Sequence, residues 1–246
     1  SDLRGAFGRS LKSSGYDALI IKGKAGKPVY IEVTEESVKI EEGGDLWGKT
    51  TGEVQSILSS KTGKGANILS IGPAGEHLVK YACISGDVQY FAGRLGMGAV
   101  MGSKNLKAIA VRGSKPVAIA SQEKYKAGRT AMLKAMKESP VLYSHFAEIG
   151  TPMVLDLTAT MGILSAKNWS ATGEFAPVEG LGIEAQNSRK IGKEHCYDCP
   201  VGCSQMKLAK NGPYAGILTE GPEFETLYSF GSGTGVTNLD AVIAAD

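Results

Sequence analysis

The sequence has little excess of one charge and no long apolar run. Its 27 Lys and Arg residues nearly balance 25 Asp and Glu residues, which gives a net charge of +2. A nucleic-acid-binding domain usually carries a strongly basic face, so this balance argues against that class. No apolar stretch approaches the roughly 20 residues that a membrane-spanning helix needs. We therefore expect neither a nucleic-acid partner nor a membrane span.

Cysteine is also scarce. The chain has four, and three of them lie within eight positions. This number and clustering do not fit a disulfide scaffold, and they are more typical of a metal centre in a reducing compartment. Nothing at Ser1 resembles a signal peptide. We therefore expect a cytoplasmic protein.

The two ends of the sequence resemble the interior of a longer chain. It begins at Ser1 without a methionine. It ends in a helical pattern, residues 241–246, with no Gly, Asn or Pro stop signal. We expect both ends to continue in a longer protein.

The patterning predicts two domains with a boundary near residues 116–122. Alternating β-branched and polar residues favour strands in the first part, and helical spacing favours a helix over 50–60 that Thr50 or Thr51 caps. We predict an α+β amino-terminal domain over residues 1–115 and a mainly helical domain over residues 116–246. The expected strands are 18–21, 29–33, 38–40, 67–71 and 105–111.

The second part has a helical composition over residues 123–137 and again over 141–160. Pro152 suits the first turn of a helix, and Thr151 before it suits a helix cap. Residues 162–190 resemble a long irregular connection. A short two-strand pattern is expected between Cys203 and Glu220.

The cysteine run predicts an inorganic centre. It contains three thiols separated by two and then three residues: Cys196, Cys199 and Cys203. Thiolates select zinc or iron–sulfur clusters, and a closed site needs four ligands. His195 adjoins the run but is badly placed to bind the same metal as Cys196, and Pro200 suits a cluster-type cysteine. We favour a cluster over structural zinc. Cys83 lies in an apolar run, and we expect a core residue there rather than the fourth ligand.

A glycine-rich segment from Gly93 to Lys104 has two open interpretations. Four glycines in ten positions let the backbone approach a ligand closely and turn its N–H groups toward an anion. Nearby cations, Lys107 among them, suit a phosphate. The spacing does not match a dinucleotide fingerprint, and a tight turn between a helix and a strand is the alternative. The candidate cofactor-binding residues are Gly93, Arg94, Gly96, Gly98, Ala99, Gly102, Ser103 and Lys104.

Taken in order, several motifs along nearly the whole chain resemble the aldehyde:ferredoxin oxidoreductase family of tungsten and molybdenum enzymes. Besides the cysteine run, they are Gly15-Tyr-Asp17, Gly23-Lys24, Leu46-Trp-Gly-Lys49, Ile71-Gly-Pro-Ala-Gly-Glu76, Gly93-Arg94, Gly98 to Ile109, Lys167-Asn-Trp169 and Gly221 to Thr226. The resemblance implies an α+β amino-terminal domain followed by helical domains. It also implies a bis-pterin tungsten or molybdenum centre beside a 4Fe-4S cluster, with Mg²⁺ bridging the pterin phosphates.

The resemblance assigns roles to the motifs. The cysteine run resembles the first three cluster ligands of the family, and the fourth follows an Asp-x-x-Gly-Leu pattern in a later segment. The glycine-rich segment lies in the domain that holds the pterin phosphates, which favours the cofactor-binding interpretation. Glu223 and Glu225 are candidates for catalytic proton transfer at the metal, with a solvated acidic turn as the alternative. On a strand they would share a face, and in a turn they could diverge.

The resemblance implies an oligomeric enzyme that oxidises aldehydes to carboxylic acids and passes electrons to ferredoxin or an iron–sulfur partner subunit. The sequence departs from the family at Tyr90-Phe-Ala92, where the family often has Arg-Ala-Ala. This departure puts the usual aliphatic aldehyde in doubt and leaves two substrates open, an aromatic aldehyde or the aromatic acyl-CoA of an aroyl-CoA (benzoyl-CoA) reductase, whose catalytic subunit is the first alternative. A further alternative, from another class, is a non-catalytic iron–sulfur electron-transfer module.

Overall fold

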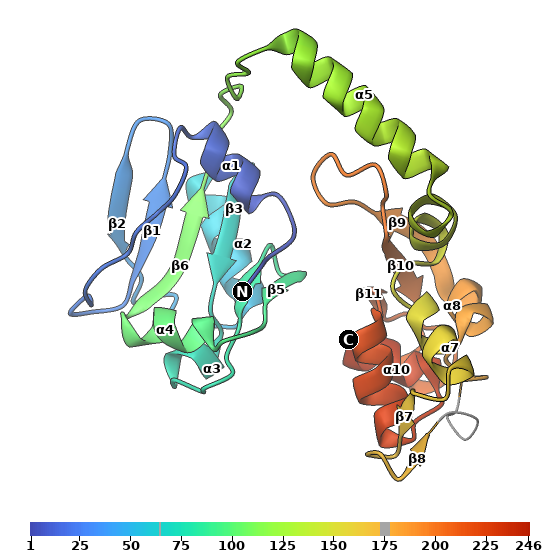
Figure 1. Ribbon diagram of the computed structural model, residues 1–246. Coiled ribbons are helices and arrows are strands. Elements are labelled where there is room, and N and C mark those ends of the chain that lie inside the picture. The colour runs from blue at the N-terminus through green and yellow to red at the C-terminus, as the bar shows by residue number, and fades with distance from the viewer. Residues whose placement is uncertain (64, 173–177) are drawn as a thin grey trace. The chain divides into compact units, whose positions relative to one another are not determined.

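The computed structural model describes residues 1–63, 65–172 and 178–246, which divide into two compact units, Ser1–Ala120 and Ser121–Asp246 (Figure 1). The first unit contains a mixed sheet with short helices, as predicted. The second is largely helical, also as predicted, and it adds a three-stranded sheet. Among the described residues, none of the helices has the length and apolar character required to cross a membrane.

The first unit is built on a six-stranded sheet in the order β2-β1-β6-β3-β4-β5. Strand β6 pairs parallel with β1 and antiparallel with β3, and all six of its residues are buried. This burial fits its largely apolar sequence, because a central strand with both faces covered is nearly all apolar, and Lys107 is the one exception in β6. The strands are β1 (Val29–Val33), β2 (Val38–Glu42), β3 (Asn67–Ser70), β4 (Ile84–Gly86), β5 (Tyr90–Ala92) and β6 (Leu106–Val111).

Helices cover both faces of this sheet. Adjacent residues of a strand point to opposite faces, so Ala108 and Ala110 pack with Val54 and Leu58 of α2, whereas Ile109 packs on the other face. That other face is covered by residues of α1 and α4. The helices are α1 (Phe7–Ser13), α2 (Thr51–Thr62), α3 (Pro73–Glu76) and α4 (Met97–Ser103).

Local signals in the first unit were mostly correct. Thr50 caps α2 in a capping box, in which the Glu53 side chain accepts from the Thr50 N–H at 2.8 Å. The predicted strand over residues 18–21 is wrong, because this segment runs as irregular chain. Leu19 and Ile21 pack against the core directly. The segment therefore buries every second side chain, as a strand does, but it pairs with no strand.

The second unit combines a small sheet in the order β11-β10-β9 with helices around a leucine-rich core. The predicted helix over residues 123–137 is α5 (Gln122–Glu138). Residues 140–146 and 227–231 form π-helical turns, and residues 212–214 and 232–234 form 3₁₀ turns. The remaining elements are α6 (Ala147–Ile149), α7 (Met153–Thr160), β7 (Ser165–Ala166), β8 (Ala171–Thr172), α8 (Ile183–Arg189), β9 (Lys190–Glu194), β10 (Ser204–Leu208), β11 (Leu218–Glu220), α9 (Phe224–Thr226) and α10 (Leu239–Ala245).

Two predictions for this unit need correction. Helix α8 lies inside the stretch 162–190 that was expected to be irregular, of which residues 173–177 lie outside the described chain. Thr151 does not cap the helix that follows it, because its hydroxyl contacts Glu223 instead. Both differences arise from tertiary contacts, which local sequence signals do not contain.

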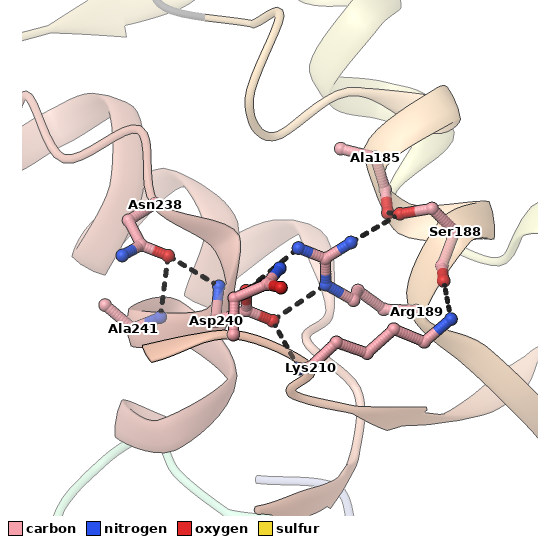
Figure 2. A network of polar contacts seen from close by, with 8 residues as sticks. Ala185, Ser188, Arg189, Lys210, Asn238, Asp240 and Ala241 are labelled. Atoms are coloured by element: carbon pink, nitrogen blue, oxygen red, sulfur yellow. Dashed lines mark hydrogen bonds and ion pairs between the residues drawn. The ribbon is translucent and has the colours of Figure 1, made fainter. Parts of the chain in front are cut away.

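A buried polar network around Asp240 joins α8, α10 and the chain after β10 (Figure 2). Asp240 is 2% exposed and receives two hydrogen bonds from Arg189, at 2.7 and 2.8 Å. The backbone N–H of Lys210 and the amide of Asn211 also donate to this carboxylate. Asn238 caps α10 by accepting from the backbone N–H of Asp240 at 3.0 Å. The Arg189 guanidinium beside it holds the pKa of Asp240 well below its usual range.

Replacing Asp240 with asparagine is expected to destabilise the protein by about 3 kcal/mol, because the Arg189 cation is left without its charge partner. The depressed pKa gives a matching pH dependence. The stabilisation is present above the unfolded pKa of about 3.9 and is lost as pH falls further, since the unfolded chain then binds more protons. Urea unfolding followed by circular dichroism measures both effects. The exposed Asp17, replaced by asparagine, is the control and should change stability by less than about 1 kcal/mol.

Candidate functional site

The cysteine run forms the loop of a β-hairpin. Strands β9 and β10 pair antiparallel, with Glu194 opposite Ser204. This pairing brings the two feet of the loop together, so Cys196 and Cys203 lie near the same end of the hairpin. Within the loop, the Cys199 N–H donates to the Cys196 carbonyl at 2.9 Å and closes a turn. Sequence separation and strand pairing therefore confine all three thiols to one short loop.

His195 supports this loop. Its Nδ1 lies 3.2 Å from the Cys199 carbonyl oxygen. Its ring also lies against Gly202, where an added Cβ would come within 2.3 Å of a ring atom. Gly202 has φ +57°, a conformation that favours glycine. His195 thus contacts the loop at two positions, Cys199 and Gly202.

The thiols are partly buried, but they do not converge. All four cysteines, Cys83 included, lie outside disulfides and are of intermediate exposure. Among the described residues, no group of three His, Cys, Asp or Glu side chains is close enough to hold a metal ion.

Cys83 was expected in the core, but its intermediate exposure means that it is only partly buried. Its segment packs through the backbone, because the Cys83 carbonyl oxygen lies against Gly98 of α4.

A pocket of about 620 Å³ opens beside the cysteine loop. Tyr125, Arg129 and Met132 of α5 line one side, and Cys199 and Pro200 line the other. The part of the loop around Cys199 therefore borders a space large enough for inorganic atoms and another ligand side chain.

The structure divides the predicted glycine loop into packed and exposed parts. An added Cβ at Gly96, Gly98 or Gly102 would lie 2.3 Å or less from a backbone oxygen of the segment 75–83. These three glycines therefore allow α4 to pack tightly, which is the turn-like interpretation. Ser103 donates to the Val100 carbonyl at 2.8 Å, and Lys104 donates to the Gly23 carbonyl at 3.1 Å.

Gly93 and Arg94 lie just before α4 and are exposed, as is Ser103 at the end of that helix. Nothing lies within 4 Å of an added Cβ at Gly93. Ala99, on α4, is partly buried. The exposed residues of the predicted set are therefore Gly93, Arg94 and Ser103.

Lys107 has a structural role rather than the phosphate-binding role suggested by its charge. Its side chain is fully buried and forms an ion pair with Glu76, which is 2% exposed. Lys107 also donates to the Lys49 carbonyl at 2.8 Å, and both Glu76 carboxylate oxygens lie 2.9 Å from the Gly48 nitrogen. This ion pair joins two motifs far apart in sequence, residues 46–49 and 71–76.

Glu223 and Glu225 lie at the start of the short helix α9 and differ in their surroundings. Glu223 accepts a hydrogen bond from the Thr151 hydroxyl, which itself accepts from the Phe224 N–H at 2.9 Å. Glu225 lies in the first turn of α9 and is exposed. Glu223 is therefore anchored to the protein, whereas Glu225 is accessible to a ligand.

Lys207, which lies beneath this turn, was not predicted from the sequence. Its side chain is 0% exposed, and its Nζ donates to the Gly221 carbonyl at 2.9 Å. Burial lowers the pKa of Lys207 to about 8, against the opposing attraction of Glu223 and Asp246. The pattern of β10, in which a lysine stands between two apolar residues, resembles a surface strand, and only the fold reveals that this lysine is internal.

Two family models match this chain. The first, aldehyde ferredoxin oxidoreductase, N-terminal domain, covers residues 1–113, and the second, domains 2 and 3 of the same family, covers residues 127–246. The chain belongs to the aldehyde ferredoxin oxidoreductase family. The resemblance inferred from the ordered motifs is thereby confirmed.

Relatives with assigned names support this membership. The chain is 38% identical to the tungsten-containing aldehyde ferredoxin oxidoreductase of Pyrococcus furiosus and 37% identical to that of Thermococcus kodakarensis, in each case over 98% of this chain and 40% of the relative. It is 28% identical to the WOR-like subunit of an aliphatic sulfonate oxidoreductase of Pyrococcus furiosus, over 99% of this chain and 41% of the relative. The chain thus spans about 40% of the length of these curated relatives.

A solved structure has the same fold. The active-site complex BamBC of benzoyl coenzyme A reductase, bound to 1,5-dienoyl-CoA, superposes with a TM-score of 0.81 at 25% identity. The match covers 99% of this chain and 38% of that chain. Named members of the family therefore include proteins with different substrates.

Proposed function

We propose that the full protein is an oxidoreductase with a tungsten or molybdenum bis-pterin centre and a 4Fe-4S cluster, which oxidises aldehydes to carboxylic acids. Electrons would pass to ferredoxin or to an iron–sulfur partner subunit of an oligomeric, cytoplasmic enzyme. The observation that carries this proposal is the arrangement around β10. The cysteine loop lies at one end of this strand, and the Glu223 turn is anchored to a residue of the same strand.

The donor set fits an iron–sulfur cluster. Cys196, Cys199 and Cys203 lie on one loop and form no disulfide, and thiolates are the usual ligands of such clusters. The pocket beside Cys199 leaves room for inorganic atoms and for a fourth ligand. Because the thiols do not converge, cluster binding would require their side chains to turn toward one another.

Gly93 and Arg94 would contact the pterin phosphates, with Mg²⁺ bridging them. Their exposure and the open space at Gly93 are compatible with a close backbone approach to an anion. Arg94 adds a fixed positive charge suited to a phosphate. Gly96, Gly98, Ala99, Gly102, Ser103 and Lys104 would support the loop through the packing of α4.

When bound, the pterin–metal centre would supply two-electron redox chemistry, and the cluster would supply a route for single electrons. Oxidation of a hydrated aldehyde to its acid releases two protons with the two electrons, so the reaction needs a proton acceptor. Glu225 would accept this proton, and its exposure beside the anchored Glu223 supports that role. Thr151 would keep the turn fixed while Glu225 acts.

A second function, reduction of an aromatic acyl-CoA, is favoured by the BamBC superposition and by Phe91, which is 53% exposed. Tyr90 is less suited to contact an aromatic substrate. It is buried, and the Arg4 guanidinium lies 5.2 Å from its ring centroid. Of the two aromatic residues that stand where the family often has Arg-Ala-Ala, Phe91 is therefore the one whose side chain is exposed to a ligand.

The test uses the full-length protein, purified without oxygen. Tungsten, molybdenum, iron and pterin would be measured first, followed by turnover of benzaldehyde and of benzoyl-CoA with a low-potential electron carrier. Metal, pterin and benzaldehyde oxidation would support the proposal, whereas turnover of benzoyl-CoA alone would favour the second function. A protein with iron but neither pterin nor turnover would be a non-catalytic iron–sulfur module. Zinc in place of iron would overturn all three interpretations.

A further inference from the structure

Lys207 is a fully buried cation beneath the turn that carries the proposed proton acceptor. Its Nζ donates to the carbonyl of Gly221, two residues before Glu223. Strand β10 fixes the lysine from both sides, since Lys207 pairs with Thr219 of β11 and with Lys190 of β9. The position of its ammonium group is therefore set by the sheet.

Stability alone does not explain this lysine. A buried charge is unfavourable unless it is well paired, and an apolar side chain of similar volume often fills such a site at no loss of stability. The charged groups that influence Lys207 are Glu223, Asp246 and Lys190. Two of these are acidic, and one of them, Glu223, belongs to the turn itself. A residue that is unfavourable for folding but placed against a candidate active-site turn points to a functional role.

We propose that Lys207 is a positioning residue, which holds the Gly221 carbonyl and attracts Glu223 so that the turn presents Glu225 to the substrate. This inference rests on the proposed function, because it assigns the effect to the proton acceptor of that reaction. Thr151 holds Glu223 from the other side. The turn is therefore fixed at two points on either side of Pro222.

The charge of Lys207 gives the proposal a pH dependence. The pKa of about 8 means that the lysine is charged at neutral pH and loses its charge as pH rises through 8. The attraction for Glu223 is then lost, and kcat should fall on the alkaline side. An arginine at this position stays charged, so the alkaline fall should move to higher pH.

The experiment compares Lys207→Met, Lys207→Arg and Lys210→Met in the full-length holoenzyme. Lys210 is the matched control, because it is an exposed lysine three positions along the chain. In Lys207→Met, kcat should fall by about 10²-fold with a smaller change in KM, because the acceptor is misplaced. Its Tm should be equal or higher, and its iron and pterin content unchanged. Lys207→Arg should recover kcat in part and shift the pH profile.

A Lys207→Met enzyme with wild-type kcat and pH profile would overturn the proposal. If Lys207→Met does not fold, the pH profile of Lys207→Arg decides, and an unshifted alkaline limb would be the contrary result. Hydrogen exchange of residues 221–227 gives a readout without turnover. Faster exchange in Lys207→Met than in Lys210→Met is expected, and equal exchange would contradict the anchoring. A wild-type enzyme inactive on aldehydes would instead count against the proposed function.

Discussion

Replacing Cys199 with serine in the full-length protein is expected to remove the iron–sulfur cluster and to abolish electron transfer to the acceptor. A serine hydroxyl is a harder and less acidic ligand than a thiol, so it replaces a cluster thiolate poorly. Iron and acid-labile sulfide per chain, together with the visible absorption spectrum, measure the effect. Cys196→Ser and Cys203→Ser should behave in the same way.

Cys83→Ser is the control for this experiment. Cys83 is also a free, partly buried thiol, but it lies in the first unit and outside the hairpin loop. The variant should keep the iron content of the wild type. Full iron in Cys199→Ser, or iron loss in Cys83→Ser, would contradict the assignment of the cluster to the loop.

Glu225→Gln is expected to lower kcat for aldehyde oxidation by about 10²- to 10⁴-fold, the usual contribution of a general acid or base. Glutamine keeps the size of the side chain but does not accept a proton. We propose this role for Glu225 rather than Glu223, because the Glu223 carboxylate already accepts a hydrogen bond from Thr151. Steady-state kinetics over a range of pH would measure the loss, with metal content and Tm unchanged.

Glu184→Gln provides the comparison, since Glu184 is an exposed glutamate in the first turn of α8. This variant should have wild-type kinetics. A small effect in Glu225→Gln together with a large one in Glu223→Gln would reverse the roles given to the two carboxylates.

Strands and capped helices of the first unit were predictable because their signals are local. The strand at Val29–Val33 was predicted with its observed bounds, and Thr50 has both a capping hydroxyl and a glutamate three residues later. Residues 18–21 are apolar and β-branched like a strand but have no strand to pair with. Pairing depends on the distant chain, so this error could not be found from local pattern.

The residues of the candidate site could be predicted from their motifs, but their arrangement in space could not. The spacing of the cysteines indicated one inorganic centre, whereas their position at the end of a hairpin follows from strand pairing. The glycines before and within α4 suggested a phosphate loop. In the structure, Gly98 and Gly102 pack against the backbone of the earlier segment 75–83. The ion pair of Glu76 with Lys107 also joins residues from separate motifs. Contacts of this kind are set by the fold.

Strand β10 constrains how the length of this chain can change in evolution. Cys203 directly precedes the strand, and Lys207 is its fourth residue. One residue inserted between them would turn Lys207 to the opposite face of the sheet and break its contact with Gly221. Within the connection from β10 to β11, residues 212–216 lie beyond the contacts of Lys210 and Asn211 with Asp240, so this part can lengthen or shorten most easily. Insertions and deletions among orthologues should therefore fall in that connection, while the interval from Cys203 to Lys207 stays constant.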